Sequence, residues 1–264
     1  MDPAKPNPGK PTNQTSLPIA EASGPGEERD ATLPISELFV SVQGEGKLTG
    51  VPSTFIRVAG CNLRCRWCDT PYASWEPAGE PMPLDAIAAQ CPTQHIVLTG
   101  GEPMIFDRIE DLAVLLKRAG KHVTIETAGT VFRELSMLDT GDLMSISPKL
   151  ANSTPENDPR DPTGAWAKRH EQRRLNVDAL NALLAGPWDR QLKFVVAQPG
   201  DLAEIDELLT KLDNWQPQDV QLMPEGVSVP EPSAVRWVVD ACVERGWRYC
   251  HRLHIELFGN TRGT

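Results

Sequence analysis

Segments of strand character alternate with segments of helical character along most of this chain, and this order restricts the possible folds more than any other feature. Short apolar runs rich in β-branched residues predict strands at 35–42, 54–59, 95–99, 123–127, 143–147, 192–196 and 220–223. Strands that alternate with helices pair in parallel through right-handed crossovers. Six of these strands follow that pattern. We therefore predict an α/β fold, an incomplete TIM-type barrel of parallel strands with outer helices.

Apolar residues at helical spacing place the helices between these strands. They predict helices at 84–90, 107–120, roughly 165–184, the stretch after Pro199, and the stretch from 235 to 243. Asp107 is expected to cap the second of these helices and Gly120 to end it. Cys242 falls on the apolar stripe of the last helix with Val239 and Val243, and is expected in the core. Cys250 and His254 follow in a late segment of strand character.

The composition predicts one domain with an unstructured extension. Residues 1–32 are rich in Pro, Gly, Ser and charge and lack an apolar period, which is typical of a disordered tail. Residues 33–264 can bury one sizeable core. Within them, 151–188 form a polar stretch without a chemical motif, and we interpret this stretch as an insertion that carries a peripheral helix.

Charge and cysteine content narrow the classes of function. The chain carries 26 basic and 36 acidic residues, a net charge of −10. This balance disfavours a general nucleic-acid or anionic-membrane binder, since both need a basic face. No apolar run has membrane length and no secretory signal is evident. Six cysteines without such a signal indicate the reducing cytoplasm, where clustered thiols are more often metal ligands than disulfides.

Three of these cysteines stand close together in Cys61-x3-Cys65-x2-Cys68. Thiolates are soft ligands, and several of them together suit zinc, copper(I) or an iron–sulfur cluster. Three thiolates leave one iron of a four-iron cluster open. A zinc site would need a fourth ligand, for which Cys91 and His95 are candidates. Spacing alone leaves zinc and the open-iron cluster equally compatible, and it also allows a disulfide framework or plain buried thiols.

Polar or otherwise unusual residues also follow the carboxyl ends of the predicted strands. Ligands gather at this end of the strands in parallel barrels, and these residues are therefore candidates for one common site. They are the cysteine loop, Gly100–Pro103, Glu126-Thr127, Ser147-Pro148-Lys149 and Met223-Pro224-Glu225.

A second motif decides between the metals. Leu98-Thr99-Gly100-Gly101-Glu102-Pro103 ends the strand after the cysteine loop, and together with the cysteine spacing it resembles the radical S-adenosylmethionine (SAM) enzymes. In that superfamily the glycine turn approaches the methionine part of SAM, and glycine permits this because it has no Cβ. The resemblance implies a radical SAM core that binds a [4Fe-4S] cluster and SAM.

Further residues narrow the resemblance to one family. Gln43-Gly44-Glu45-Gly46, Arg57, the run Trp67-Cys68-Asp69-Thr70, and Leu253-His254 before a short tail are similar to the 7-carboxy-7-deazaguanine synthases. The resemblance extends from about residue 35 to the C-terminus and is weakest over 151–188. Members of this family are carbon–nitrogen lyases of 7-deazapurine (queuosine precursor) biosynthesis. They convert 6-carboxy-5,6,7,8-tetrahydropterin to 7-carboxy-7-deazaguanine with loss of ammonia, use Mg²⁺ and form homodimers.

The resemblance also implies the roles of individual residues. The expected cluster ligands are Cys61, Cys65 and Cys68, and the expected Mg²⁺ ligand is Thr70. The expected SAM contacts are Trp67, Cys68, Asp69, Gly101, Glu102, Ser147, Pro148, Lys149, Gln221, Leu222, Met223 and Pro224. The expected substrate contacts are Val42, Gln43, Gly44, Glu45, Arg57, Thr99, His254 and Thr264. No protein group is expected to be catalytic, because cluster and SAM generate the radical.

The resemblance leaves two other hypotheses to consider, and it implies one protein partner. A radical SAM activase, which puts a glycyl radical on a partner protein, would share both motifs but would not need Arg57 or Glu45. A zinc or electron-transfer protein without catalytic activity would share only the thiols. The radical SAM reaction itself requires an external electron donor of the flavodoxin or ferredoxin type.

Overall fold

A computed structural model describes residues 31–264. Residues 1–30 of the predicted tail lie outside the described residues. The first strand, β1, begins at Thr32. Among the helices of residues 31–264, none combines the length and the apolar character that crossing a membrane requires.

One sheet of nine strands organises the described residues, in the order β3-β1-β2-β4-β5-β6-β7-β8-β9. All neighbours from β2 to β9 pair in parallel, whereas β1 runs antiparallel to both β2 and β3. The strands are β1 Thr32–Val42, β2 Pro52–Val58, β3 Glu80–Pro83, β4 His95–Gly100, β5 His122–Thr127, β6 Leu143–Ile146, β7 Asp189–Val196, β8 Val220–Pro224 and β9 Arg248–Tyr249. The sheet does not close on itself, which confirms the predicted partial barrel.

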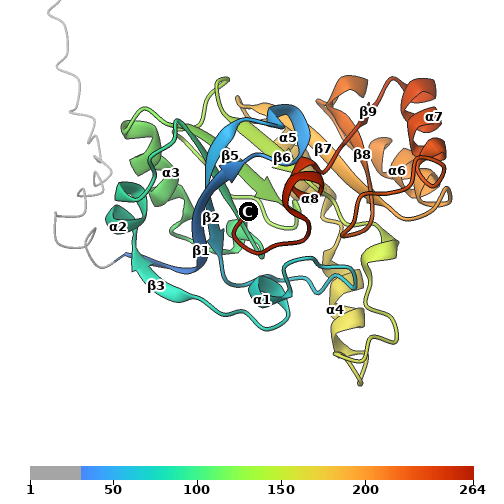
Figure 1. Cartoon of the computed structure of the whole chain (residues 1–264), viewed down its shortest axis with the longest axis horizontal. Helices are drawn as coiled ribbons and strands as arrows, with labels where there is room; N and C mark the ends of the chain where they lie inside the picture. Colours follow the sequence, from blue (N-terminus) through green and yellow to red (C-terminus); the bar gives the residue numbers. More distant parts are fainter. Residues whose placement is uncertain (1–30) are drawn as a thin grey trace, which may run out of the picture.

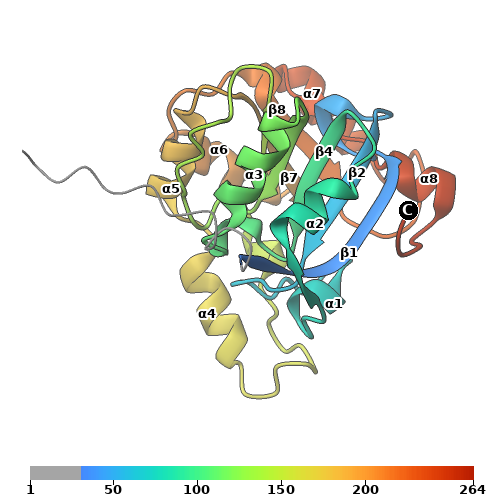
Figure 2. The same cartoon turned by 90° about the vertical axis from the view of Figure 1, so that its left-hand side faces the viewer.

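Helices connect the parallel strands and pack beside them. They are α1 Pro71–Ser74, α2 Leu84–Ala89, α3 Ile109–Arg118, α4 Ala165–Arg173, α5 Val177–Leu184, α6 Asp201–Leu209, α7 Arg236–Arg245 and α8 Leu253–Phe258. The contacts of α3 with β5, α5 with β6, α6 with β7 and α7 with β8 form the outer layer. Figure 2 shows these helices around the outside of the sheet, and Figure 1 shows α8 and the C-terminal segment in front of it.

The main hydrophobic core lies between the sheet and these outer helices. It includes fully buried side chains from strands and helices alike, among them Ile56, Leu98, Leu112, Leu180 and Phe194. Cys91 and Cys242 belong to this core, which confirms that Cys242 is structural. Val239 and Val243 are exposed, so the apolar stripe predicted for that helix was too wide.

Three local predictions were wrong. Helix α3 begins after Arg108 without a side-chain cap, and Asp107 instead pairs with Arg133 at 2.6 Å. The helix predicted at 165–184 is divided into α4 and α5, because the side chain of Asn176 accepts a hydrogen bond from the backbone N–H of Ala179 and starts a new helix. His254, expected in a late strand, lies on the short helix α8.

Candidate active site

A cavity of about 460 Å³ lies at the carboxyl ends of the parallel strands, where ligands were expected. It is lined by the cysteine loop, the ends of β1 and of six parallel strands, the start of α8 and the last five residues of the chain. Eighteen expected site residues line it: Val42, Gln43, Gly44, Glu45, Arg57, Cys61, Cys65, Trp67, Cys68, Asp69, Thr70, Thr99, Gly101, Ser147, Lys149, Met223, His254 and Thr264. The fold therefore brings residues from most of the chain to one place.

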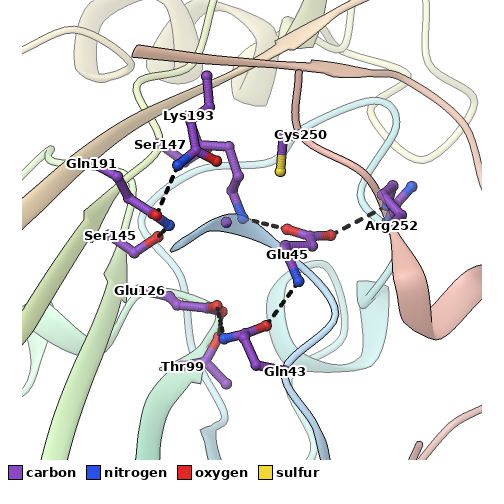
Figure 3. Close-up of polar contacts among 12 residues, drawn as sticks. Gln43, Glu45, Thr99, Glu126, Ser145, Ser147, Gln191, Lys193, Cys250 and Arg252 are labelled. Atoms are coloured by element: carbon purple, nitrogen blue, oxygen red, sulfur yellow. Dashed lines mark hydrogen bonds and ion pairs between the residues drawn. The ribbon is translucent and has the colours of Figure 1, made fainter. Parts of the chain in front are cut away.

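Five expected residues are not part of this lining: Glu102, Pro148, Gln221, Leu222 and Pro224. Leu222 is fully buried in the core. The side chain of Gln221 donates to Gln191 at 3.0 Å in a polar layer beneath the cavity, and Gln191 in turn donates to Ser145 at 2.8 Å. Figure 3 shows Ser145 and Gln191 next to Lys193. Any contact from Gln221 or Leu222 to a bound cofactor would therefore come from the backbone.

The cysteine loop follows β2 and is held by its own backbone and by its neighbours. The buried Arg64 donates to the carbonyls of Cys61 at 2.8 Å and Leu63 at 2.7 Å, and it stacks on Trp166. Trp75 donates to the carbonyl of Cys65 at 3.0 Å. These contacts fix the path of the loop, while the three thiols all face the same cavity.

The donor set of this loop fits an iron–sulfur cluster. Burial raises the pKa of the Cys61 thiol to about 12 and also raises the pKa of Cys65. A cationic metal centre reverses this effect, because a coordinating thiol is deprotonated outright. Three thiols in one cavity can each bind a different iron, which leaves the fourth iron for SAM.

Both candidates for the fourth ligand of a zinc site, Cys91 and His95, lie away from the cysteine loop. Cys91 lies in the hydrophobic core and donates to the carbonyl of Ile87 at 3.2 Å. His95 begins β4 and packs against His122, with ring centroids 4.5 Å apart and the rings tilted by 42°. Since β2 and β4 are parallel, His95 lies at the opposite end of the sheet from the cysteine loop.

The glycine turn packs directly against the cysteine loop. Gly100 has a φ of +143°, which favours glycine, and a Cβ on Gly101 would overlap the backbone of Gly60 and Ala73. The backbone N–H of Glu102 donates to the carbonyl of Gly60 at 2.9 Å. These glycines are thus required by the packing of two backbone segments as well as by the expected approach of a cofactor.

Glu102 is completely buried, and its carboxylate has protein partners at both oxygens. It accepts hydrogen bonds from the N–H of Met104 at 3.0 Å, the hydroxyl of Thr127 at 2.7 Å and the N–H of Ala128 at 2.7 Å. Burial nevertheless raises the pKa of Glu102 above its usual value. The side chain therefore joins the glycine turn to the end of β5.

A buried ionic network lies on one wall of the cavity (Figure 3). Glu45 forms ion pairs with Lys193 and, at 3.2 Å, with Arg252, which also pairs with Asp69 at 2.6 Å. Burial raises the pKa of Glu45, but the two cations outweigh it and lower the pKa to about 2. Glu45 is therefore a carboxylate at neutral pH, held in place by two cations.

Neither cation was predicted from the sequence. Lys193 interrupts the apolar strand β7, just as Arg57 interrupts β2. A cation inside an apolar strand is a signal that could have marked Lys193 as a functional residue. Arg252 stands in a polar stretch before α8 and carried no such indication. Burial lowers the pKa of Lys193, but the neighbouring carboxylates, Glu45 foremost, outweigh it and raise the pKa above its ordinary value, so this cavity wall keeps an ammonium group at neutral pH.

A second carboxylate, Glu126, lies on the same wall. It accepts hydrogen bonds from Thr99 at 2.8 Å and from the side-chain amide of Gln43 at 3.2 Å. Gln43 in turn accepts from the backbone N–H of Glu45 at 3.1 Å, which joins this group to the ionic network. Glu126 was expected near the site without a role, and the structure now links it to two expected substrate contacts.

The predicted insertion holds the cysteine loop. The backbone N–H of Arg66 donates to the carbonyl of Ser153 at 2.9 Å, and the indole of Trp67 donates to Asn152. On α4, the fully buried His170 accepts from the backbone N–H of Arg64 at 3.1 Å. The expectation of a merely peripheral segment was thus wrong, because these residues lie against the loop that carries the thiols.

Comparison with known proteins identifies the family. Residues 55–183 match the radical SAM superfamily. The 7-carboxy-7-deazaguanine synthase of Rhodopirellula baltica is 46% identical over 93% of this chain and 94% of its own length. The one from Halobacterium salinarum is 45% identical over 96% of this chain and its full length. The crystal structure of QueE from Escherichia coli has a TM-score of 0.63 at 26% identity and covers 84% of this chain and 95% of that one.

Proposed function

The chain belongs to the 7-carboxy-7-deazaguanine synthase family of radical SAM enzymes, and we propose that it converts 6-carboxy-5,6,7,8-tetrahydropterin to 7-carboxy-7-deazaguanine with loss of ammonia. One observation carries the proposal. The three thiols of the cysteine loop share a single cavity with the guanidinium of Arg57 and with the carboxylates of Glu45 and Glu126. This cavity can hold a redox cofactor and a substrate that bears both an anionic group and several N–H donors.

The cofactor side of the cavity is the cysteine loop and the ends of β4 and β6. Cys61, Cys65 and Cys68 would hold a [4Fe-4S] cluster, which together with SAM supplies a hydrogen-abstracting radical. Lys149 extends across this side, where its ammonium donates to the carbonyl and hydroxyl of Ser147 at 2.7 and 2.8 Å. A cation so placed suits the carboxylate of SAM.

The substrate side is the opposite wall. Arg57 is a planar fork suited to the carboxylate of the pterin. Ionised Glu45 accepts hydrogen bonds without donating any, and it can therefore select the amino and ring N–H groups of the pterin, with the carboxyl oxygens of Glu126 beside it as further acceptors. His254 and the end of the chain complete this side.

Magnesium, the reductant and the oligomeric state belong to the same proposal. Thr70 lines the cavity next to Asp69, and one hydroxyl is a weak Mg²⁺ ligand unless substrate oxygens complete the shell. We expect the reductant to be an external flavodoxin- or ferredoxin-like protein and the enzyme to be a homodimer. The glycyl-radical activase is disfavoured, because the cavity wall bears Arg57 and Glu45, which that reaction does not need.

Anaerobic turnover tests the proposal. The reconstituted enzyme, given SAM, Mg²⁺, reductant and the carboxytetrahydropterin, should form one equivalent of 7-carboxy-7-deazaguanine and of ammonia per pterin consumed. The Cys65→Ala chain is the matched negative control. Cleavage of SAM to 5′-deoxyadenosine without any deazapurine product, at saturating pterin, would overturn the assignment of the substrate.

A further inference from the structure

The end of the chain is anchored beside β1 at two points. At the first, the backbone N–H of Leu253 donates to the carbonyl of Gly44 at 2.9 Å, and His254 packs so closely on Gly44 that a Cβ there would overlap its ring. At the second, Arg262 forms an ion pair with Glu37 of β1 at 2.6 Å. Residues 259–264, here called the C-terminal strap, include the second anchor, and their last five residues line the cavity.

Glu37 is the centre of the second anchor. Its carboxylate accepts hydrogen bonds from Arg57 at 2.7 Å, from the hydroxyl of Tyr72 at 2.9 Å and from Arg262. The guanidinium of Arg262 also lies 4.1 Å from the centre of the Tyr72 ring. Glu37 is only 9% exposed, so one desolvated carboxylate joins a cation of the cavity wall to a cation of the strap.

The pattern of contacts leaves Arg57 free to bind a ligand. Of its three guanidinium nitrogens, Nε is the one with a hydrogen-bond partner among residues 31–264. Because Nε is held by Glu37, the two terminal nitrogens remain for a second carboxylate. Arg57 and Arg262 share the single carboxylate of Glu37, so these three side chains together carry one positive charge in excess. An anionic ligand would balance that charge.

An ordinary surface ion pair is the alternative explanation for Arg262, whose side chain is 55% exposed. Exposed pairs of this kind contribute little. Here, however, the acceptor is buried and the same carboxylate orients Arg57. Such shared networks couple their members beyond the sum of the separate pairs. The position of the strap and the orientation of Arg57 therefore depend on the same side chain.

We propose that Glu37 is a positioning residue, which orients Arg57 toward the substrate carboxylate and, through Arg262, holds the C-terminal strap over the same ligand. This inference rests on the proposed function, because the carboxylate that Arg57 meets is that of the pterin. It adds Glu37, Tyr72 and Arg262 to the residues on which substrate binding depends. None of the three needs to touch the pterin itself.

Three variants test the coupling by kinetics: Glu37→Gln, Arg262→Gln and the double variant. Each single variant should raise the KM for the pterin about tenfold with kcat little changed, since both variants break the same coupled group of contacts. The double variant should be no worse than the poorer single variant. Cleavage of SAM without pterin should stay at the wild-type rate. Glu207→Gln and Arg236→Gln, which break exposed pairs elsewhere, are the matched controls.

A second readout does not depend on turnover. Carboxypeptidase digestion of the cluster-loaded enzyme should release Thr264 and Gly263 about tenfold faster from Glu37→Gln than from the wild type or Glu207→Gln, if the anchor contributes roughly 1.4 kcal/mol to closing the strap. The rate of digestion does not depend on which substrate the enzyme uses. If the wild type never converted the pterin, the proposed function would be refuted, but the digestion would still show whether Glu37 holds the strap.

Four results would overturn the inference. One is a wild-type KM in Arg262→Gln, which would reduce the anchor to a surface pair. Another is strictly additive loss in the double variant, which would mean that Arg262 contributes to substrate binding independently of Glu37. The third is unchanged release of the last two residues from Glu37→Gln. A Glu37→Gln protein that loses SAM cleavage as well would also count against it, because the defect would then reach the cofactor side.

Discussion

Replacing Lys193 by Met tests how much the buried network around Glu45 stabilises the fold. Met keeps most of the length of the side chain and removes its charge. In the wild type, Lys193 and Arg252 share Glu45, and the side chains of all three are at most 14% exposed. In the variant, Glu45 retains Arg252 as its ion-pair partner, and its second oxygen loses a charged donor.

The size of the effect follows from the pKa of Glu45, which is about 2 in the folded chain instead of 4.5. At 1.36 kcal/mol per pH unit, this difference corresponds to about 3 kcal/mol of stabilisation from the surrounding charges. Removing one partner of a buried pair typically costs about 3–5 kcal/mol, and because Arg252 remains we expect about 2–3 kcal/mol. For a domain of this size, that loss lowers Tm by roughly 4–12 °C.

The effect should depend on pH in one direction. A carboxyl whose pKa is lowered by folding stabilises the protein above its unfolded value, here 4.5, and this contribution disappears as the pH falls toward 2. The difference between wild type and Lys193→Met should therefore be largest near pH 7 and should shrink below pH 4.5.

Urea denaturation of the cluster-free protein, followed by tryptophan fluorescence at pH 7 and pH 4, measures this difference. Lys211→Met, which breaks an exposed helical pair with Glu207, is the control and should leave the free energy of unfolding nearly unchanged. A Lys193→Met chain as stable as the wild type at pH 7 would refute the reasoning. A more stable chain would show that the network is retained for function at a cost in stability.

The remaining predictions concern the cluster, the substrate and the chain end. Changing any one of the three loop cysteines to Ala should abolish the cluster. Changing any of the other three cysteines to Ala should leave the iron content near that of the wild type. A stable four-iron cluster in Cys65→Ala would contradict the ligand assignment. Arg57→Lys should strongly weaken pterin binding, because one ammonium cannot replace the bidentate fork, and should leave SAM binding unchanged in titrations. His170→Phe should lower iron content after reconstitution, because it leaves the buried Arg64 N–H without its acceptor; full iron content would show that the loop does not depend on the insertion. A tag after Thr264 should raise the pterin KM without altering the cluster spectrum, and wild-type kinetics would refute the contact of the chain end.

Much of the fold and the identity of the cofactor site were predictable because they depend on local patterns. Strand and helix types follow from the spacing of apolar residues over five to fifteen positions, and the cysteine and glycine motifs each occupy fewer than ten residues. Parallel strands then bring their carboxyl ends together, so the order of the strands was enough to assign the residues at those ends to one cavity. Arg57 was assigned to the substrate only through the resemblance to the family.

Local patterns could not show which residues that are distant in the sequence contact each other. Lys193 meets Glu45 across 148 positions and Arg262 meets Glu37 across 225. His170 of the insertion meets Arg64 across 106. Such pairs depend on the register of the sheet, on where the antiparallel β1 lies and on how the chain end returns to it. The sequence does not show whether a charged residue is paired with water, with a ligand or with a buried counter-ion. The tertiary structure decides, because packing removes water from some charged groups, and a charge without water requires a partner.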